Sequence, residues 1–226
     1  MTLADRILSF NKSLTITSKL PSGVEVLNPF QQSGTFRLCE LFYKKYYNDS
    51  NTRTLILGIN PGRFGAGLTG VPFTDPIKLE ERCGIPNRMQ KKAELSADFM
   101  YKMFDALGGP EVFFSKFYIS SVSPLGFVKD GKNLNYYDIK ELEKMVTAFA
   151  VDSLQKQLEF GLSPEICFCL GEGKNFKFLN GLNEKYRFFT SIVPLPHPRF
   201  IMQYRRKRLS EFINLYINRL RVVLPD

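Results

Sequence analysis

Residues 55–73 read LILGINPGRFGAGLTGVPF, an apolar run typical of a buried strand that leads directly into a glycine-rich loop. The run ends at Asn60, so a polar side chain follows the strand at its carboxyl end, where open α/β sheets bind their ligands. Glycines let backbone N–H groups approach a ligand closely. The loop contains Gly62, Gly65, Gly67 and Gly70. The stretch therefore predicts the floor of a binding pocket.

Outside this stretch the composition is that of an ordinary globular protein, except for its charge. With 226 residues, 44% of them hydrophobic, the chain can bury one sizeable core. We expect a monomer with a single domain over 1–226, in which N-terminal helices within 1–50 pack on a core formed by 51–226. The chain has 31 Lys and Arg against 22 Asp and Glu, a formal net charge of +9. Such an excess favours nucleic acid as a partner over a membrane surface.

Membrane and export signals are not evident in the sequence. No stretch approaches the roughly 20 apolar residues of a spanning helix, and residues 1–14 lack the basic start and long apolar core of a signal peptide. We therefore expect a cytoplasmic protein without a membrane partner. The spacing of Cys167 and Cys169 is poor for a shared metal ion, and these residues, like Cys39 and Cys83, are predicted to be buried, reduced thiols. No metal ion and no cofactor are expected.

Strand-like and helix-like segments alternate along the chain. Helices are expected near 3–13, 33–48, 94–107 and 138–160, after 171–173, and from about 205 to 220. Strands are expected at 54–59, 117–122, 166–170 and 188–194. This alternation predicts an α/β fold with a short parallel sheet, helices on both faces and the loops after the strands along one edge. The long irregular stretch 60–92 is typical of a functional loop.

The glycine loop formally matches a dinucleotide-binding fingerprint, because residues 65–70 read GAGLTG. That fingerprint needs a helix to begin inside the glycines, whereas Val71-Pro72-Phe73 follows and Thr74-Asp75-Pro76 is expected to break any helix. We expect Asp75 to lie in a turn. A phosphate-binding P-loop is excluded as well, because no Gly-Lys-Ser/Thr closes the loop.

Three residues near the predicted sheet edge have alternative interpretations. Asn60 precedes a proline and is typical of a turn, but an amide at a strand end can also hold a water molecule. Phe73 is either a core residue or a platform on which a planar base stacks. His197, the single histidine, lies between two prolines after the last predicted strand, so a role at the site and simple solvent exposure are equal alternatives.

A basic segment follows His197. It contains Arg199, Arg205, Arg206, Lys207 and Arg208, with Phe200, Met202 and Tyr204 interleaved. It is either a solvated helix start or a surface that contacts phosphates. Basic side chains at a helix N-terminus oppose the helix dipole, which favours the phosphate interpretation. The interleaved aromatic residues are suited to wedging into a stack of bases.

With these residues in view, the chain resembles the uracil-DNA glycosylase superfamily, and within it the single-strand-selective monofunctional uracil-DNA glycosylases. Four segments, in family order between about 55 and 208, carry the resemblance. They are Gly58-Ile59-Asn60-Pro61-Gly62 with Phe64-Gly65 and Thr69-Gly70-Val71-Pro72-Phe73; Ser123-Pro124-Leu125 with Gly131-Lys132-Asn133-Leu134; Leu170-Gly171-Glu172-Gly173; and His197-Pro198.

The resemblance implies a three-layer α/β/α sandwich around a four-stranded parallel sheet. It also implies excision of uracil or a 5-modified uracil from single- or double-stranded DNA by base flipping, without metal or cofactor. In this scheme Asn60 positions the attacking water and His197 stabilises the departing base anion. The implied base-binding residues are Ile59, Gly62, Phe64, Phe73 and Ser121, and the implied DNA-binding residues are Arg199, Phe200, Arg205, Arg206 and Lys207. The small size of Gly62 implies tolerance of a substituent on the 5-position of uracil.

Two departures from the family pattern keep alternatives open. Ser121 stands where the family has an Asn that reads the uracil edge, and one hydroxyl cannot replace the paired donor and acceptor of an amide. Residues 199–202 replace the family's Ser-Pro-Arg run. A catalytically weak or inactive nucleic-acid-binding protein is therefore the alternative to a DNA glycosylase. An enzyme acting on free nucleosides is a third hypothesis, which the basic charge disfavours.

Overall fold

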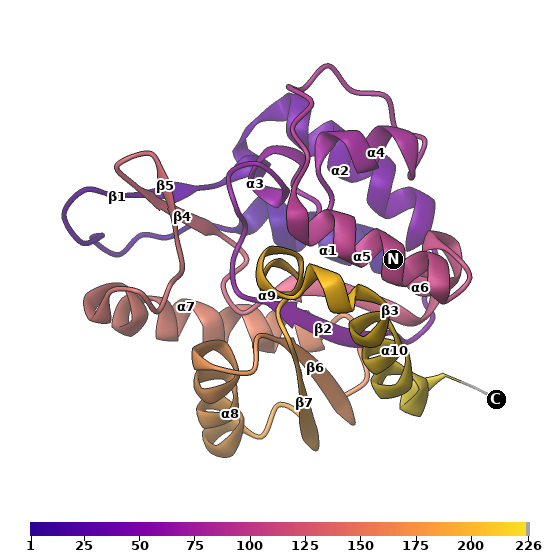
Figure 1. Ribbon diagram of the computed structural model, residues 1–226. Coiled ribbons are helices and arrows are strands. Elements are labelled where there is room, and N and C mark those ends of the chain that lie inside the picture. The colour runs from indigo at the N-terminus through magenta and orange to yellow at the C-terminus, as the bar shows by residue number, and fades with distance from the viewer. Residues whose placement is uncertain (225–226) are drawn as a thin grey trace.

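A four-stranded parallel sheet forms the centre of the structure, a computed structural model that describes residues 1–224 (Figure 1). Its strands are β2 (Thr54–Gly58), β3 (Phe117–Ser121), β6 (Ile166–Leu170) and β7 (Ser191–Leu195). Their spatial order is β3-β2-β6-β7, so β2 pairs with a strand on each side. Because all neighbours are parallel, the carboxyl ends of the four strands lie along one edge. The predicted parallel sheet is confirmed.

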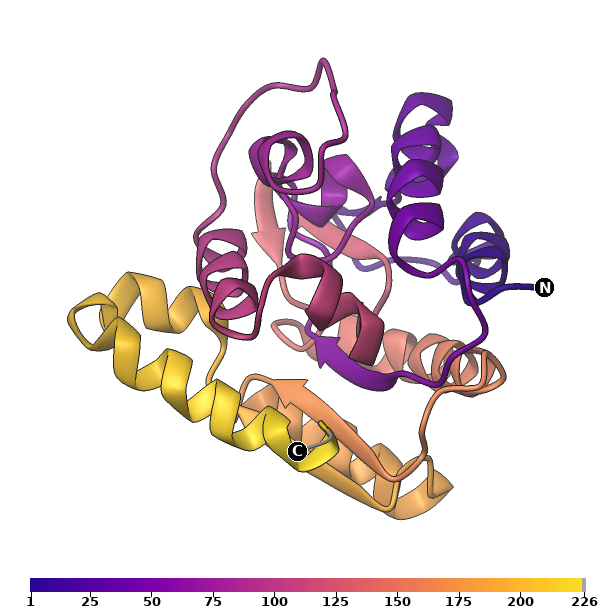
Figure 2. The same cartoon turned by 90° about the vertical axis from the view of Figure 1, so that its right-hand side faces the viewer.

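Helices cover both faces of this sheet (Figures 1 and 2). On one face lie α7 (Lys140–Leu158) and α8 (Lys174–Tyr186). On the other face lie α1 (Leu3–Ser13), α2 (Ser33–Tyr46), α5 (Leu95–Ala106) and α6 (Pro110–Lys116). The C-terminal helix α10 (Leu209–Leu220) packs against α5, and short 3-10 helices cover 29–31, 206–208 and 221–223. This is the predicted three-layer α/β/α sandwich.

Burial on both sides explains why the strand at 54–58 has no polar face. All five positions of β2 and of β3 are buried, and Leu55 and Leu57 are fully inaccessible. Parallel strands between two helical layers read as continuous apolar runs for this reason. The N-terminal helices share the same core, and the hydroxyl of Tyr47, directly after α2, donates a hydrogen bond to the Phe117 carbonyl at 3.0 Å.

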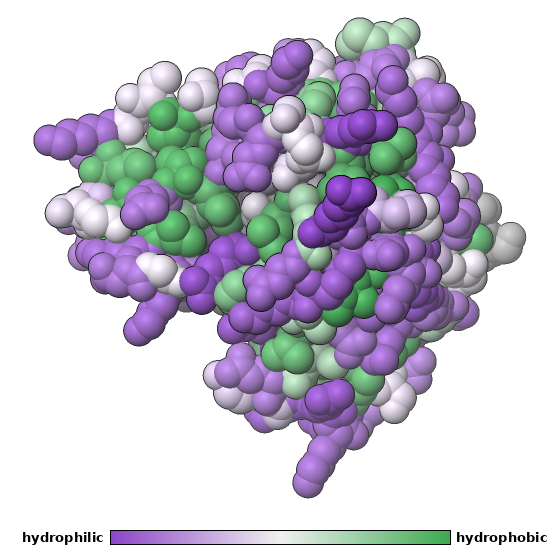
Figure 3. All heavy atoms as spheres, turned by 90° about the horizontal axis from the view of Figure 1, so that it is seen from above, coloured by the Kyte–Doolittle hydropathy of each residue, from purple (hydrophilic) through white to green (hydrophobic). Residues whose placement is uncertain are grey.

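A second, smaller sheet was not expected from the sequence. It consists of β1 (Val24–Leu27), β4 (Gly126–Lys129) and β5 (Lys132–Leu134), all antiparallel. The β4–β5 hairpin turns at Asp130-Gly131, whose φ angles are 49° and 67°. An Asp-Gly pair with two positive φ angles is a strong hairpin turn, so this element had a local sequence signal. The surface seen from above is mostly hydrophilic, with an apolar area on the side that carries this sheet (Figure 3).

The structure corrects three local expectations. The stretch 60–92 contains two short helices, α3 (Ala66–Thr69) and α4 (Pro76–Glu81). Thr74-Asp75-Pro76 starts a helix instead of breaking one, because the Asp75 carboxylate caps α4 by accepting the Lys78 N–H and proline suits the first helical turn. The basic segment 205–208 lies between α9 (Pro198–Tyr204) and α10, so no single helix runs from 205 to 220.

The four cysteine side chains are free and buried, as predicted. Within residues 1–224, no helix combines the length and apolarity that a bilayer crossing requires. The same part of the chain holds no cluster of three His, Cys, Asp or Glu side chains suited to a metal ion.

Candidate active site

A cavity of about 660 Å³ opens at the carboxyl edge of the sheet, where the loops after β2, β3 and β7 meet. Nine of the residues expected at the site line it: Ile59, Asn60, Gly62, Phe64, Phe73, Ser121, His197, Arg199 and Phe200. The other three, Arg205, Arg206 and Lys207, are exposed just beyond α9 and do not line the cavity. The structure thus brings together residues that lie up to 141 positions apart in the sequence (59 to 200).

The Asn60 amide is held by backbone groups at the end of the small sheet and just after it. Its Nδ2 donates to the Leu134 carbonyl at 3.2 Å, and its Oδ1 accepts the Tyr136 N–H at 3.0 Å. These two bonds fix the orientation of the amide, with Nδ2 towards the Leu134 carbonyl and Oδ1 towards the Tyr136 N–H. A carbonyl oxygen has a second lone pair. Asn60 Oδ1 can therefore accept a further hydrogen bond from a water molecule in the cavity.

The same backbone segment is anchored to the sheet through two buried side chains. The Tyr136 hydroxyl donates to Asn175 Oδ1 at 2.8 Å, and Asn175 Nδ2 contacts the carbonyls of Gly58 and Leu170 at 3.5 and 3.1 Å. Gly58 and Leu170 end the neighbouring strands β2 and β6. Asn60 is thus positioned by a closed chain of hydrogen bonds that starts and ends at β2.

Phe73 lies across the end of the central strand. Its φ angle is 53°, an unusual conformation for a bulky residue and one often found at functional sites. A Cβ atom on residue 58 would lie 3.0 Å from the Phe73 ring and 3.5 Å from the Ser121 hydroxyl oxygen. Gly58 therefore allows the ring to approach the strand end, next to Ser121.

The N–H groups of three loop glycines do not act as expected. The N–H groups of Gly65 and Gly67 donate to the Gly62 carbonyl at 3.2 and 2.9 Å, and Gly70 N–H donates to Ala66. These N–H groups are hydrogen-bonded within the loop and are therefore not available to a ligand. The missing side chains instead make room for protein groups, because Cβ atoms at 65, 67 and 70 would collide with Glu94, Leu27 and Cys39 respectively.

His197 is the N-cap residue of α9. Its Nδ1 accepts the Arg199 backbone N–H at 3.1 Å, so in the neutral imidazole the proton is on Nε2. Burial, and to a smaller extent the charge of Arg199, lowers the pKa of His197 to about 4. At neutral pH the site therefore holds an uncharged imidazole that donates from Nε2. The ring lies 6.1 Å from the Phe73 ring, centroid to centroid.

Eight residues outside 55–73 that line the cavity were not among the predicted site residues, although Lys132, Asn133 and Tyr204 already belonged to the sequence motifs described above. They are Glu94, Ser96, Lys132, Asn133, Asn135, Tyr137, Gln203 and Tyr204. Half of them come from the segment 132–137, which lies within and just after the unexpected small sheet. Glu94, directly before α5, contributes a carboxyl group to the lining of the cavity. Burial, with a further contribution from Asp75, raises the pKa of Glu94 to about 7.

The rim of the cavity carries aromatic rings beside cationic groups. The Phe64 ring is contacted by Lys92 and Arg63, at 3.7 and 4.3 Å from the ring centroid. On α9, Phe200 and Tyr204 are 43% and 61% exposed, and the Arg205 guanidinium lies 5.4 Å from the Phe200 ring centroid. Large aromatic side chains this exposed beside cations are typical of a surface that binds a polyanion with planar groups.

The family model described as the uracil DNA glycosylase superfamily matches residues 44–221. The chain belongs to the uracil DNA glycosylase superfamily. The matched range includes the central sheet, the cavity and all four segments of the sequence resemblance, which is thereby confirmed.

Two curated relatives share the name single-strand selective monofunctional uracil-DNA glycosylase. The chain is 30% identical over 115 residues to the single-strand selective monofunctional uracil-DNA glycosylase of Rattus norvegicus, which covers 43% of this chain and 41% of that protein. It is 28% identical over 125 residues to the Mus musculus protein of the same name, which covers 46% and 45%. The matched segment therefore spans less than half the length of either mammalian relative.

A crystal structure matches over almost the whole chain. Wild-type SMUG2 from Pedobacter heparinus is 49% identical in sequence and aligns with a TM-score of 0.95 over 98% of this chain and 98% of that one. The α/β/α fold with its parallel sheet is thus the fold of the SMUG2 crystal structure.

The hydrogen bond between Tyr136 and Asn175 predicts a stability difference between two adjacent tyrosines. In Tyr136→Phe the buried Asn175 carbonyl loses its partner, and we expect the free energy of unfolding to fall by about 1–3 kcal/mol, measured by urea denaturation. Tyr137→Phe is the matched control, because the Tyr137 hydroxyl has no protein partner among the described residues. Equal stability losses in the two variants would contradict the role assigned to Tyr136.

The environment of His197 predicts its titration. Because this is the single histidine, its imidazole signals in an NMR titration are unambiguous. We expect no protonation between about pH 8 and 5.5 and a proton on Nε2, since the folded pKa lies well below the ordinary value of about 6.5. The unfolded chain then binds the proton first, so stability falls as the pH drops from about 6.5 towards 4. A midpoint near 6.5 in the folded protein would contradict this description.

Proposed function

We propose that the protein is a monofunctional DNA repair glycosylase that hydrolyses the N-glycosidic bond of uracil or a 5-modified uracil in DNA. The observation that carries the proposal is the pairing of a fixed Asn60 amide with a neutral, Nε2-protonated His197 across one cavity of a superfamily fold. Metal ions and cofactors have no part in the proposed reaction.

The proposed reaction begins with extrusion of the damaged nucleotide from the stack, which costs a few kcal/mol. The bond between C1′ of the sugar and N1 of the base breaks, and its electron pair leaves with the base. Water held by Asn60 Oδ1 forms the new bond to C1′, and the proton that the water loses neutralises the base anion. The products are the free base and an abasic site.

The protonation state of His197 suits this reaction. Negative charge develops on the O2 oxygen of the leaving base, and a fixed N–H donor stabilises such a charge most where water is excluded. An Nε2–H donor is available over the whole neutral range because the imidazole stays uncharged. On the sugar side the developing oxocarbenium ion attracts water strongly, so an amide that orients the water suffices and no carboxylate base is required.

Base recognition in this proposal rests on three parts of the pocket. Phe73 stacks on the base, the Ser121 hydroxyl contacts its N3–O4 side, and the backbone of Ile59 and Gly62 borders it. A single hydroxyl discriminates less than an amide. We therefore propose that base preference is broader than uracil alone and includes 5-modified uracils.

The DNA strand is proposed to run across α9 and the segment after it. Arg199, Arg205, Arg206 and Lys207 are exposed and form no ion pair among residues 1–224, so they are free to neutralise phosphates. Phe200 and Tyr204 project from the same helix at the cavity mouth and are candidates for the wedge that fills the vacated stack.

Three further properties belong to this proposal. A single domain over 1–226 is supported by the shared hydrophobic core of the N-terminal helices and the central sheet. A monomeric state is part of the same proposal. A cytoplasmic location is supported by the four free, buried thiols, since reducing compartments preserve free cysteines.

Two substitutions test the chemistry. We expect His197→Ala to lower single-turnover base release by roughly 10²–10³-fold through loss of the N–H donor, and Asn60→Ala to lower it by roughly 10²–10⁴-fold through loss of water positioning. DNA affinity should stay within about threefold, because neither side chain contacts phosphates. The assay uses oligonucleotides with uracil, 5-hydroxymethyluracil, hypoxanthine or xanthine in single and double strands.

Asn48→Ala, at an exposed position beyond α2, is the matched control and should release base at the wild-type rate. Unchanged rates in both site variants would exclude the mechanism. Tight DNA binding by a wild-type protein that releases no base would favour the nucleic-acid-binding alternative. Hydrolysis of free deoxyuridine as fast as that of an oligonucleotide would favour a nucleoside hydrolase.

The proposed DNA surface predicts a salt effect. For single-stranded DNA, Arg206→Ala and Lys207→Ala should each reduce the slope of log Kd against log salt concentration by about 0.7, because each removes one phosphate contact. Lys116→Ala is the matched control, since Lys116 precedes β3 and lies at the opposite edge of the sheet. An equal change in slope for Lys116→Ala would show that net charge, rather than this surface, governs the affinity.

A further inference from the structure

The segment that carries His197 is poor in backbone hydrogen-bond donors. It contains Pro194, Pro196 and Pro198, which have no N–H group. β7 is also an edge strand, because β6 is its only neighbour among the strands that the structure describes. No further strand holds the outer side of this segment, so its carbonyl groups depend on donors from other parts of the chain.

Two carbonyl groups directly before His197 accept hydrogen bonds from side chains of α10. The Arg219 guanidinium donates to the Pro194 carbonyl at 3.2 Å. The Tyr216 hydroxyl group donates to the Pro196 carbonyl, and this bond is buried. The C-terminal helix therefore fastens the end of β7 and the first residues after it.

Tyr216 is itself fixed by packing. Its side chain is fully buried, and its ring packs edge-on against Phe99 of α5, with the ring centroids 4.9 Å apart. Burial raises the pKa of the Tyr216 hydroxyl group well above its ordinary value, so the group keeps its proton at neutral pH. Tyr216 thus presents a hydrogen-bond donor at a fixed place in the core.

The bond from Tyr216 acts on the backbone at His197. The Pro196 carbonyl belongs to the peptide unit whose nitrogen is that of His197, and this unit is planar. A hydrogen bond to its oxygen therefore also fixes the direction from which the chain enters His197. On the other side of the residue, Nδ1 accepts the Arg199 N–H at 3.1 Å. The imidazole is held between these two anchors.

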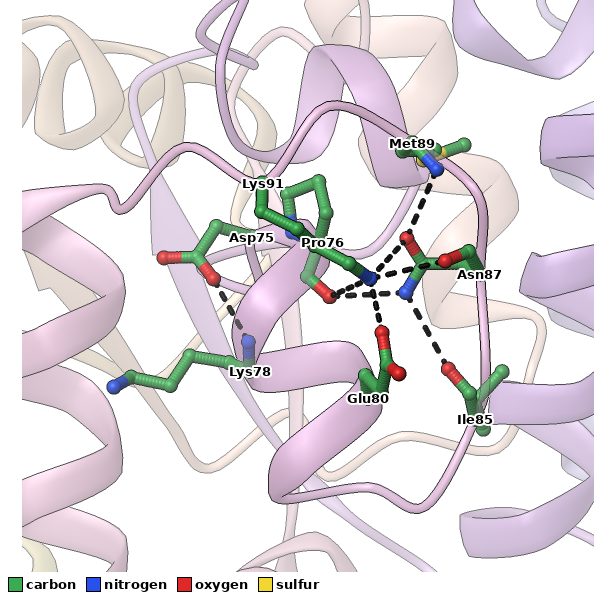
Figure 4. Close-up of polar contacts among 8 residues, drawn as sticks. All are labelled: Asp75, Pro76, Lys78, Glu80, Ile85, Asn87, Met89 and Lys91. Atoms are coloured by element: carbon green, nitrogen blue, oxygen red, sulfur yellow. Dashed lines mark hydrogen bonds and ion pairs between the residues drawn. The ribbon is translucent and has the colours of Figure 1, made fainter.

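Side chains also donate to a proline carbonyl in the loop before α5, but in a more exposed setting (Figure 4). The Pro76 carbonyl accepts from Asn87 Nδ2 at 2.9 Å and from Lys91 Nζ at 3.4 Å, and the Lys91 side chain is 41% exposed. Water can replace a donor that is lost there. Inside the core, loss of the Tyr216 hydroxyl group leaves a carbonyl unpaired, and the backbone at Pro196 has to move to find a partner.

We propose that Tyr216 is a positioning residue for His197, assisted by Arg219, and that it holds the Nε2–H donor where negative charge develops on the leaving base. The inference rests on the proposed function. A donor displaced by about an ångström stabilises the developing charge much less, because the benefit of a fixed donor depends on its geometry. Tyr216 is not among the residues that line the cavity, so it acts through His197 rather than on the base.

A double-mutant cycle tests this role. Tyr216→Phe keeps the ring on Phe99 and removes only the hydroxyl group. We expect single-turnover release of uracil from a single-stranded oligonucleotide to fall by about tenfold, while DNA affinity stays within about twofold. In the His197→Ala background the same substitution should change the rate by less than about twofold, because the group that Tyr216 positions is no longer there.

Tyr46→Phe is the matched control. Tyr46 is a buried tyrosine of α2 that does not line the cavity, and its hydroxyl group has no hydrogen-bond partner among the described residues. Removal of the same atom from this residue should leave the rate of base release unchanged in both backgrounds.

An NMR titration of His197 gives a second measurement, which does not depend on base release. Burial lowers the pKa of His197 to about 4 in the wild-type protein. In Tyr216→Phe we expect the midpoint to rise by about one pH unit or more, because a less tightly held segment lets water reach the imidazole. Tyr46→Phe should keep the wild-type midpoint.

Equal rate losses for Tyr216→Phe in the two backgrounds would overturn this inference and leave the proposed function intact, as would an unchanged rate with an unchanged midpoint. A wild-type protein that releases no base would overturn the proposed function, and the titration alone would then decide whether Tyr216 positions His197. Should Tyr216→Phe fail to fold, Arg219→Met takes its place in both measurements, with an expected rate loss of about threefold that disappears in the His197→Ala background.

Discussion

The hydrogen bonds that hold the Asn60 amide are the constraint on which the rest of the site depends. Asn60 leaves the central strand at its carboxyl end, but its orientation is set by the carbonyl of Leu134 and the N–H of Tyr136, more than 70 residues further along the chain. Those backbone groups are in turn held by the Tyr136 hydroxyl on Asn175, which joins the ends of β2 and β6. The small antiparallel sheet, peripheral as it is in the fold, therefore supplies the scaffold for the central polar residue of the cavity.

Two other polar residues of the cavity, His197 and Glu94, are held at the starts of the helices that they precede. His197 is oriented by its own helix, because Nδ1 accepts the N–H of Arg199 at the start of α9. The backbone N–H of Glu94 donates to Asp75, 19 residues earlier, a residue that also caps α4. Burial disfavours the charged form of both groups, so it lowers the pKa of His197 and raises that of Glu94. The result is a pocket in which the charged forms of the histidine and of the carboxyl group are disfavoured, although the cations Lys132 and Arg199 also line it.

The glycine loop borders the cavity, but its glycines serve a different purpose from the one predicted. The loop was expected to present its N–H groups to a ligand, and it does border the cavity. However, the N–H groups of Gly65 and Gly67 bind the Gly62 carbonyl, and the space left by the missing side chains is filled by Glu94 and Leu27. Glycine here permits close packing of side chains that come from distant parts of the chain. A sequence pattern identifies the positions without side chains but does not identify what occupies the space.

The sequence by itself determined the parallel sheet, the alternation of strands and helices along the chain, and the edge at which Asn60 and His197 meet. These follow from local periodicity and from the rule that parallel strands end on the same side. The positions of Glu94 and Tyr136 were decided by the tertiary structure, because each depends on a contact with a distant residue. Gly65 lies 29 residues from Glu94, and Asn60 lies 76 residues from Tyr136. The protonation states of His197 and Glu94 were decided there too, since desolvation arises only when the chain closes around them.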